Sequence, residues 1–267
     1  MTRLPAVAWQ NLCVHQDGVT LTERIIPEEV AVAFTYGRSS YAVMMATPAD
    51  LDDFALGFSL SEGVIETPAQ VAALEIIPQQ LGIELRMELT EACDAALLKR
   101  RRAMAGPAGC GLCGIESLSA ATRPLRCIES SVRVPASHIF AAMEALHANQ
   151  PLNAQTRAIH GAGFWSVERE ALVLVREDVG RHNALDKLCG AIARAGISAR
   201  SGIVVMTSRI SIEIVQKAAM LGVGVLAAIS VPTAYAVKEA ENANLTLVAV
   251  ARDDSFEVFT HRERILV

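Results

Sequence analysis

Two cysteines in a glycine-rich segment are the side chains of this sequence that are best suited to covalent chemistry. Cys110 and Cys113 lie within residues 109–114, which also contain three glycines. Glycine gives the backbone freedom to present a side chain in more than one direction. The thiolate is the reactive form of cysteine, and cationic neighbours such as the basic run at residues 99–102 favour it. The segment therefore favours a nucleophilic thiol that can reach more than one position.

A CxxC pair also has other interpretations. A lone pair is equally typical of half a zinc site or of a redox disulfide. A structural zinc site takes four ligands, and the sequence contains no second CxxC. A thioredoxin-type pair follows a strand at the start of a helix, whereas this one follows a predicted basic helix over residues 91–105. A CxxC redox or zinc-binding regulatory protein remains the alternative, and a nucleotide-binding module without chemistry is a third hypothesis.

A strand-to-helix turn carries the second group of polar residues. Residues 177–187 follow a predicted strand at residues 171–175 and open a helix that begins near His182. Gly180 lets the backbone approach a ligand, while Arg181 and His182 add donors to the free N–H groups of a helix start, which favour an anion. The alternative is that these side chains only cap the turn or face solvent. The density of polar residues in one turn favours a ligand site.

Two further turns follow predicted strands. Ser208 and Arg209 come after an apolar run at residues 202–206, and Thr233 comes after the run at residues 223–229. Ligands of open α/β sheets bind outside the carboxyl ends of the strands. Hydroxyl groups, arginine and helix N-termini at such an edge suit phosphate. The sequence therefore predicts a crevice for an anionic ligand at one rim of one sheet.

The elements that must position these residues divide the chain into three parts. We predict an N-terminal tail at residues 1–24, an α+β part at residues 25–134 that ends in the CxxC segment, and an α/β cofactor-binding domain at residues 135–267. In the last part, buried aliphatic strands alternate with helices. That pattern predicts a mostly parallel sheet covered by helices on both faces.

Local patterns in the middle part predict its elements. Apolar runs at residues 30–35 and 41–45 predict a hairpin. Asp50 is a possible N-cap for the helix that follows it. Residues 83–89 alternate strictly between apolar and polar, which predicts a strand with one wet face.

Composition excludes several classes of protein. Of the 267 residues, 52% are hydrophobic and 20% are charged, which excludes a disordered chain. The formal net charge of -5 argues against general nucleic-acid binding, which needs a basic footprint. We expect neither a membrane span nor a secretory signal, because no apolar run is long enough for either. A compact cytoplasmic protein with reduced cysteines is the expectation.

Several motifs together resemble the FdhD family, the formate dehydrogenase accessory sulfurtransferases. The motifs are Cys-Gly-Leu-Cys-Gly at residues 110–114, the polar turn at 177–187, Ser-Arg-Ile-Ser at 208–211, and the segments at 56–63 and 245–248. They occur in the same order as in the family, and the likeness runs from about residue 25 to the end of the chain.

The resemblance implies an activity, a fold and partners. A member of this family takes sulfur from a cysteine desulfurase as a persulfide. It passes the sulfur to the molybdenum or tungsten bis-(molybdopterin guanine dinucleotide) cofactor of formate dehydrogenase, a bound substrate, and holds no permanent metal of its own. Cys110 would be the persulfide carrier and Cys113 its partner. The α/β part would be a three-layer α/β/α domain similar to the cytidine deaminase fold, without its zinc, in a homodimer.

The resemblance also implies a cofactor-contacting stretch near the C-terminus. It corresponds here to Val250, Ala251, Arg252, Asp253, Asp254 and Ser255. Two carboxylates beside a diphosphate weaken binding unless they point away from it. We therefore expect this stretch to contact the ligand through backbone N–H groups and Ser255, with both carboxylates turned to solvent.

Overall fold

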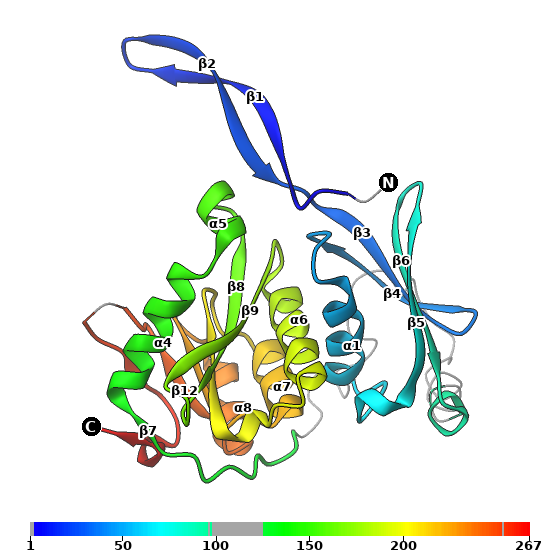
Figure 1. Ribbon diagram of the computed structural model, residues 1–267. Helices are drawn as coiled ribbons and strands as arrows, with labels where there is room; N and C mark the ends of the chain where they lie inside the picture. The colour runs from blue at the N-terminus through cyan, green and yellow to red at the C-terminus, as the bar shows by residue number, and fades with distance from the viewer. Residues whose placement is uncertain (1–2, 96, 98–124, 253) are drawn as a thin grey trace.

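A computed structural model of the chain describes residues 3–95, 97, 125–252 and 254–267 (Figure 1). The CxxC segment, with Cys110 and Cys113, and most of the basic helix predicted before it lie outside these residues. Asp253 also lies outside them.

The predicted hairpin and wet-faced strand belong to a four-stranded sheet whose order is β4-β3-β6-β5. Its strands are β3 Val30–Tyr36, β4 Ser39–Ala46, β5 Val71–Gln79 and β6 Gly82–Leu89. Alternate apolar residues of β3 and β6 point to one face, where they are buried under helix α1, Leu51–Ser61. Phe34 of β3 anchors this packing, with its ring stacked on Phe58 and edge-on to Phe54.

Asp50 occupies the N-cap position of α1, but it does not cap the helix through its side chain. Its backbone is left-handed, with φ of 53°, and its side chain makes no capping hydrogen bond. Its carboxylate instead lies 3.6 Å from the guanidinium of Arg176. The predicted helix start is therefore confirmed, whereas the predicted capping contact is wrong because a distant arginine attracts the carboxylate.

A six-stranded sheet forms the centre of the second part, in the order β13-β12-β11-β10-β8-β9. Its strands are β8 His160–Ser166, β9 Ala171–Asp178, β10 Gly202–Met206, β11 Val225–Ala228, β12 Thr246–Ala249 and β13 Glu257–Val258. Only the two pairings within β10, β11 and β12 are parallel, and the other three are antiparallel. The prediction of a mostly parallel sheet is therefore wrong.

Strand β8 causes most of this difference. It contains Gly161 and Gly163, which weaken the apolar signature of a strand. The short connection at residues 167–170 joins β8 to β9 as a hairpin, and such a connection requires antiparallel pairing. Gly163 packs closely against its neighbours, because a Cβ there would lie 2.9 Å from a Leu172 methyl group, which would have to shift.

Helices cover both faces of this sheet. One face packs against α6 Arg181–Arg194, α7 Ile212–Leu221 and α8 Ala234–Asn242, and the other packs against α4 Ala136–Ala148 (Figure 1). The expected three layers of helix, sheet and helix are thus present. The short elements are α5 Pro151–Thr156, β7 Val134–Pro135, β14 Ile265–Leu266, and 3-10 helices at Pro68–Gln70, Ala199–Ser201 and Arg262–Arg264.

The two parts join where α1 packs against α6 (Figure 1). Gly57 of α1 faces the backbone of α6, and Gly190 of α6 faces the backbone of α1. A Cβ at Gly57 would lie 2.6 Å from the backbone nitrogen of Gly190, and one at Gly190 would lie 2.7 Å from the carbonyl carbon of Asp53. The helices therefore approach each other more closely than side chains would allow.

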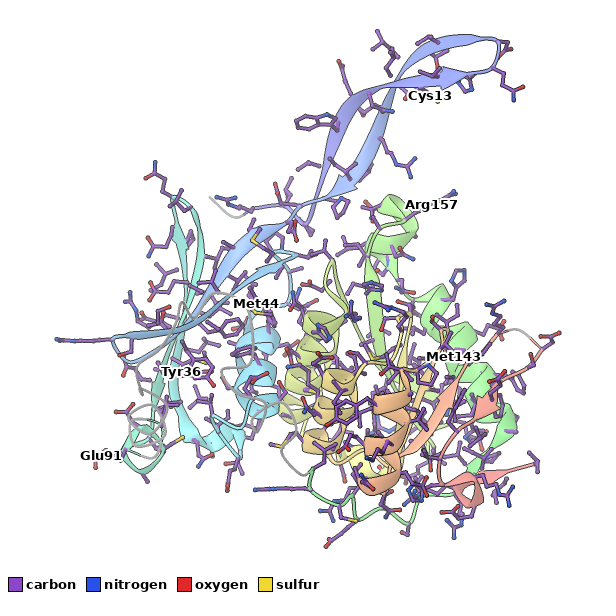
Figure 2. The ribbon with its side chains drawn as sticks, turned by 180° about the vertical axis from the view of Figure 1, so that it is seen from behind. Cys13, Tyr36, Met44, Glu91, Met143 and Arg157 are labelled. Carbon is purple, nitrogen blue, oxygen red and sulfur yellow. The ribbon has the colours of Figure 1, made fainter. Side chains whose placement is uncertain are left out.

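The segment that we set apart as a tail contains regular structure. Strands β1 Ala6–His15 and β2 Gly18–Pro27 form a hairpin that projects from the rest of the molecule (Figure 1). Cys13 lies toward the outer end of this hairpin, whereas Arg157, which follows α5, lies on the main part of the molecule (Figure 2). One face of the hairpin is mixed, with the exposed Trp9 opposite Arg24 and Asn11 opposite Thr22. The other carries the exposed apolar side chains Leu12, Val14, Val19 and Leu21.

None of the helices in the described ranges is long and apolar enough to cross a membrane.

Candidate functional site

The predicted turns meet at one edge of the six-stranded sheet. Strands β9, β10, β11 and β12 all run in one direction, so their carboxyl ends lie at the same edge as the amino end of the antiparallel β8. Backbone hydrogen bonds join neighbouring turns there, such as Ile229 N–H to Met206 O at 3.2 Å and Ala251 N–H to Ala228 O at 3.1 Å. We call this edge the rim.

Arg181 and His182 lie in the first turn of α6, after the N-cap Gly180. The Nε atom of Arg181 is buried and has no hydrogen-bond partner within the described part of the chain. His182 Nε2 lies 3.4 Å from the hydroxyl oxygen of Ser211 and 3.9 Å from a carboxylate oxygen of Glu213. An arginine N–H without a partner beside a helix N-terminus is a suitable donor for an anion.

Two neutral histidines border this arginine. Burial, and then the charge of Arg181, lower the pKa of His182 to about 4. The same two causes lower the pKa of His160, which begins β8 at the rim. Both imidazoles are therefore neutral at pH 7. His160 is absent from the predicted site, because a lone histidine next to glycines is only a weak signal in the sequence.

The other polar residues of the 177–187 segment point inward. The Asp178 carboxylate accepts hydrogen bonds from the backbone N–H groups of Thr47 at 3.0 Å and Gly180 at 2.8 Å, and from Asn183 Nδ2 at 2.9 Å. It also lies 2.7 Å from the ammonium nitrogen of Lys187, and both charged side chains are 0% exposed. Burial lowers the pKa of Lys187, and the negative charge of Asp178 acts in the opposite direction. These residues bind each other and leave no group free for a ligand.

A second buried ion pair lies further along α6. Lys217 of α7 lies 2.9 Å from Asp186, and Ser61 at the end of α1 donates a 2.6 Å hydrogen bond to the same carboxylate. Burial alone would lower the pKa of Lys217, but Asp186 and Glu62 raise it. This pair also joins the two parts of the chain, and the charge of Lys217 acts on the nearby His182.

The remaining predicted rim residues differ in whether their side chains are free to bind a ligand. Arg209 is exposed. Ser208 is buried, and its hydroxyl donates to the carbonyl oxygen of Arg209 at 3.0 Å. The Thr233 hydroxyl accepts a hydrogen bond from Ala236 N–H at 3.2 Å and so caps α8. Arg209 therefore has a free side chain, whereas the two hydroxyl groups already have partners.

The C-terminal stretch follows β12 at the same rim. Val250 has a left-handed backbone, with φ of 52°, and Ala251 is buried. Arg252, Asp254 and Ser255 are exposed, and the Ser255 hydroxyl donates to the Asp254 carboxylate at 3.2 Å. The exposure of Asp254 agrees with the expectation for that carboxylate, while the Ser255 hydroxyl is held by its neighbour.

A family comparison identifies the kind of protein. The model of the FdhD/NarQ family matches residues 27–266. The chain belongs to the FdhD/NarQ family. "Sulfur carrier protein FdhD" of Agrobacterium fabrum is 56% identical over 248 residues, which is 92% of this chain and 90% of that protein. "Sulfur carrier protein FdhD" of Brucella abortus is 52% identical over 257 residues, 96% of this chain and 95% of that one.

A solved structure has the same fold as this family member. The crystal structure of a formate dehydrogenase accessory protein from Desulfotalea psychrophila matches with a TM-score of 0.77 and 24% sequence identity. The match covers 98% of this chain and 99% of that one.

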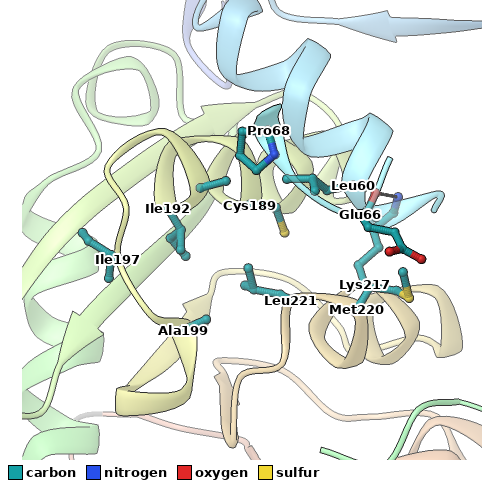
Figure 3. Close-up of a pocket in the computed structure, with 12 residues that line it drawn as sticks. Leu60, Glu66, Pro68, Cys189, Ile192, Ile197, Ala199, Lys217, Met220 and Leu221 are labelled. Carbon is teal, nitrogen blue, oxygen red and sulfur yellow. Dashed lines mark hydrogen bonds between the residues drawn. The ribbon is translucent and has the colours of Figure 1, made fainter. Parts of the chain in front are cut away.

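A cavity of about 190 Å³ lies away from the rim of this FdhD/NarQ chain, between α1, α6 and α7 (Figure 3). Leu60, Ile192 and Leu221 line it, together with the thiol of Cys189. Burial raises the pKa of this thiol, so it is a poor nucleophile. No group of three or more His, Cys, Asp or Glu residues in the described part could hold a metal ion.

Proposed function

We propose that this chain is a sulfur carrier that matures formate dehydrogenase. The support is its match to sulfur carrier proteins of the same family over most of its length. The CxxC pair supplies the type of nucleophile that such a carrier needs. The donor is a cysteine desulfurase, and the recipient is the molybdenum or tungsten cofactor of formate dehydrogenase, bound as a substrate.

Sulfur loading on Cys110 is a thiol exchange. The Cys110 thiolate attacks the outer sulfur of a persulfide on the desulfurase, a new S–S bond forms on Cys110, and the desulfurase cysteine leaves as its thiolate. Cys113 can then release the sulfur: its thiolate attacks the inner sulfur of the Cys110 persulfide, hydrosulfide leaves, and a disulfide between the two cysteines remains. Hydrosulfide is the form in which a sulfur ligand can replace an oxygen ligand on the metal.

The rim is the proposed binding site for the guanine dinucleotide part of the cofactor. Its diphosphate needs donors, and Arg181 has a buried Nε atom without a partner among the described residues. Arg209 and the N–H groups at the start of α6 add positive charge at the same edge. Gly180, His182, Ser208, Thr233 and the stretch at residues 250–255 complete the proposed set, of which Asp253 lies outside the described residues.

Three further properties come from the resemblance to the family. We propose that the α/β part is similar to the cytidine deaminase fold, that the protein is cytoplasmic, and that it is a homodimer. Light scattering on purified protein tests the last point: a mass of two chains is expected, and a mass of one chain at micromolar concentration would refute the dimer.

Maturation of a formate dehydrogenase tests the function. The enzyme is produced in a host that lacks its own carrier, together with wild type, Cys110→Ala or Cys127→Ala. Cys127 is an exposed cysteine, so its variant controls for the loss of a reactive thiol. We expect activity with wild type and Cys127→Ala and none with Cys110→Ala. Stoichiometric zinc in the purified protein, lost in Cys110→Ala, would instead establish the zinc-binding alternative.

A further inference from the structure

The buried polar residues of the 177–187 segment are tied to a distant loop. Lys187 Nζ donates to the carbonyl oxygens of Thr47 at 3.0 Å and Glu177 at 3.3 Å, in addition to its contact with Asp178. The three protons of its ammonium group are thereby all used. Asp178 accepts from the backbone N–H of Thr47. We call Asp178, Lys187 and Thr47 the Thr47 clasp.

The clasp holds the backbone on which Arg181 stands. The Thr47 hydroxyl accepts a hydrogen bond from Val179 N–H at 3.1 Å, and Asp178 accepts one from Gly180 N–H at 2.8 Å. The two residues before Arg181 are therefore each fixed by one contact to the clasp. A charged pair that is 0% exposed is held in one arrangement, because separating it would leave a buried charge without a partner.

We propose that Asp178, Lys187 and Thr47 are positioning residues for the rim, which hold the 179–182 turn so that Arg181 faces the anionic part of its ligand. They touch no ligand themselves. This inference rests on the proposed function for the identity of the ligand, but the arrangement of the turn can be measured without any ligand.

The second ion pair provides a matched control. Asp186 lies in the same helix, is 1% exposed, contacts a lysine at 2.9 Å, and also joins the two parts of the chain. Its partners are Ser61 and Lys217, and its carboxylate makes no hydrogen bond to the 179–182 turn within the described part of the chain. One of its carboxylate oxygens is buried without a partner among the described residues, so the comparison with Asp178 is made at matched losses in Tm. A purely structural role predicts the same effect on binding from the loss of either charge.

Binding of GDP, which carries the guanine and a diphosphate, is measured by calorimetry at fixed salt. Asp178→Asn places an amide N–H₂ group opposite donors from Thr47 and Lys187, so the turn must move. We expect the Kd for GDP to rise by about tenfold or more in Asp178→Asn and by less than about threefold in Asp186→Asn, at comparable losses in Tm. Equal rises in the two variants would overturn the proposal.

A milder pair of variants covers the case in which Asp178→Asn does not fold. Thr47→Val removes the hydroxyl that accepts from Val179, whereas Thr47→Ser keeps it. We expect weaker GDP binding in Thr47→Val and wild-type binding in Thr47→Ser. Equal affinity in the two variants would refute a role for the hydroxyl.

The titration of His182, followed by NMR, reports on the turn without a ligand. The groups that face this ring are Arg181, Glu213, Lys217 and His160. Burial is the larger cause of the low pKa of His182 and Arg181 the second, so if Arg181 moves away in Thr47→Val the pKa rises above about 4 but stays below 6.5, and in Thr47→Ser it does not change. An unchanged titration in Thr47→Val would refute the positioning role. If wild type does not bind GDP, the proposed cofactor site is refuted, and the NMR titration of His182 in the two Thr47 variants then decides whether the clasp positions the turn.

Discussion

Alanine at Gly57 or Gly190 should destabilise the protein, although alanine is the better helix former. Each glycine faces the backbone of the opposite helix at the α1–α6 contact. An added methyl group at Gly57 would lie 2.6 Å from the backbone nitrogen of Gly190, where a normal contact is about 3.5 Å or more. The carbonyl oxygen of Asp186 lies closer still, and because the obstacle is backbone and not a movable side chain, the helices must separate by more than about 1 Å.

Two effects of opposite sign determine the size of the change. Replacing glycine by alanine within a helix stabilises it by about 1 kcal/mol. Overpacking of a close contact costs about 1–3 kcal/mol, and here it also strains the 2.6 Å hydrogen bond from Ser61 to Asp186. The obstacle is backbone, so the cost lies near the upper end of that range, and we expect a net loss of about 2 kcal/mol for either variant, which lowers Tm by roughly 4–8 °C.

Thermal unfolding of Gly57→Ala, Gly190→Ala and the double variant measures this. Gly18→Ala is the control, because a Cβ at Gly18 meets nothing within 4 Å, and its Tm should equal that of wild type. One separation of the helices relieves both clashes, so the double variant should lose less than the sum of the single losses. A higher Tm in either single variant would show that helix propensity dominates and that the close contact is absent.

Four further outcomes are expected. Between pH 7 and pH 5, the free energy of unfolding of wild type should fall by about 2 kcal/mol more than that of His182→Gln, as measured by urea titrations at both pH values. His182 has a pKa of about 4 in the folded state and 6.5 in the unfolded state, so its contribution to stability is full above pH 6.5 and is lost as the pH falls toward 4. Arg209→Ala should weaken GDP binding roughly 10- to 100-fold, the loss of one charge-assisted hydrogen bond, and equal affinities in calorimetry would make Arg209 a solvated surface residue. Replacing Asp253 and Asp254 by Asn should change GDP affinity by less than about tenfold, since solvent and salt screen an exposed carboxylate, and a much larger gain would mean that the carboxylates face the phosphates. Leu21→Ser should leave Tm unchanged in a scanning experiment, because Leu21 is 81% exposed, and a clear fall would show that the apolar hairpin face is covered.

Local patterns in the sequence were sufficient to predict many elements. Strand β10 has the bounds of the apolar run at residues 202–206, and β6 contains the alternating run at residues 83–89, because each is a short run with clear ends. The convergence of the turns after β9, β10 and β11 was also predicted, since it needs only that these strands run in one direction. The roles of the rim residues stay predictions.

Contacts between distant residues could not be predicted in this way. The hydrogen bond between Thr47 and Asp178 joins residues 131 positions apart, and nothing local to either residue indicates it. The density of polar residues at 177–187 predicted a ligand site there, with Gly180, Arg181 and His182 as its members. The structure separates Arg181, whose buried Nε atom has no partner among the described residues, from an inward group with Lys187. Residue type and density do not distinguish the two groups, because the face of the helix on which a residue lies decides whether its side chain is buried.

The most direct test of the sulfur-carrier function is mass spectrometry of Cys110 after loading. The purified protein is incubated with a cysteine desulfurase and cysteine, and the peptide that contains Cys110 is analysed without reductant. We expect this peptide to gain the mass of one sulfur atom in wild type, in Cys113→Ala and in Cys127→Ala, and the gain to disappear in Cys110→Ala. A gain that persists in Cys110→Ala, or no gain in wild type, would contradict the assignment of Cys110 as the carrier.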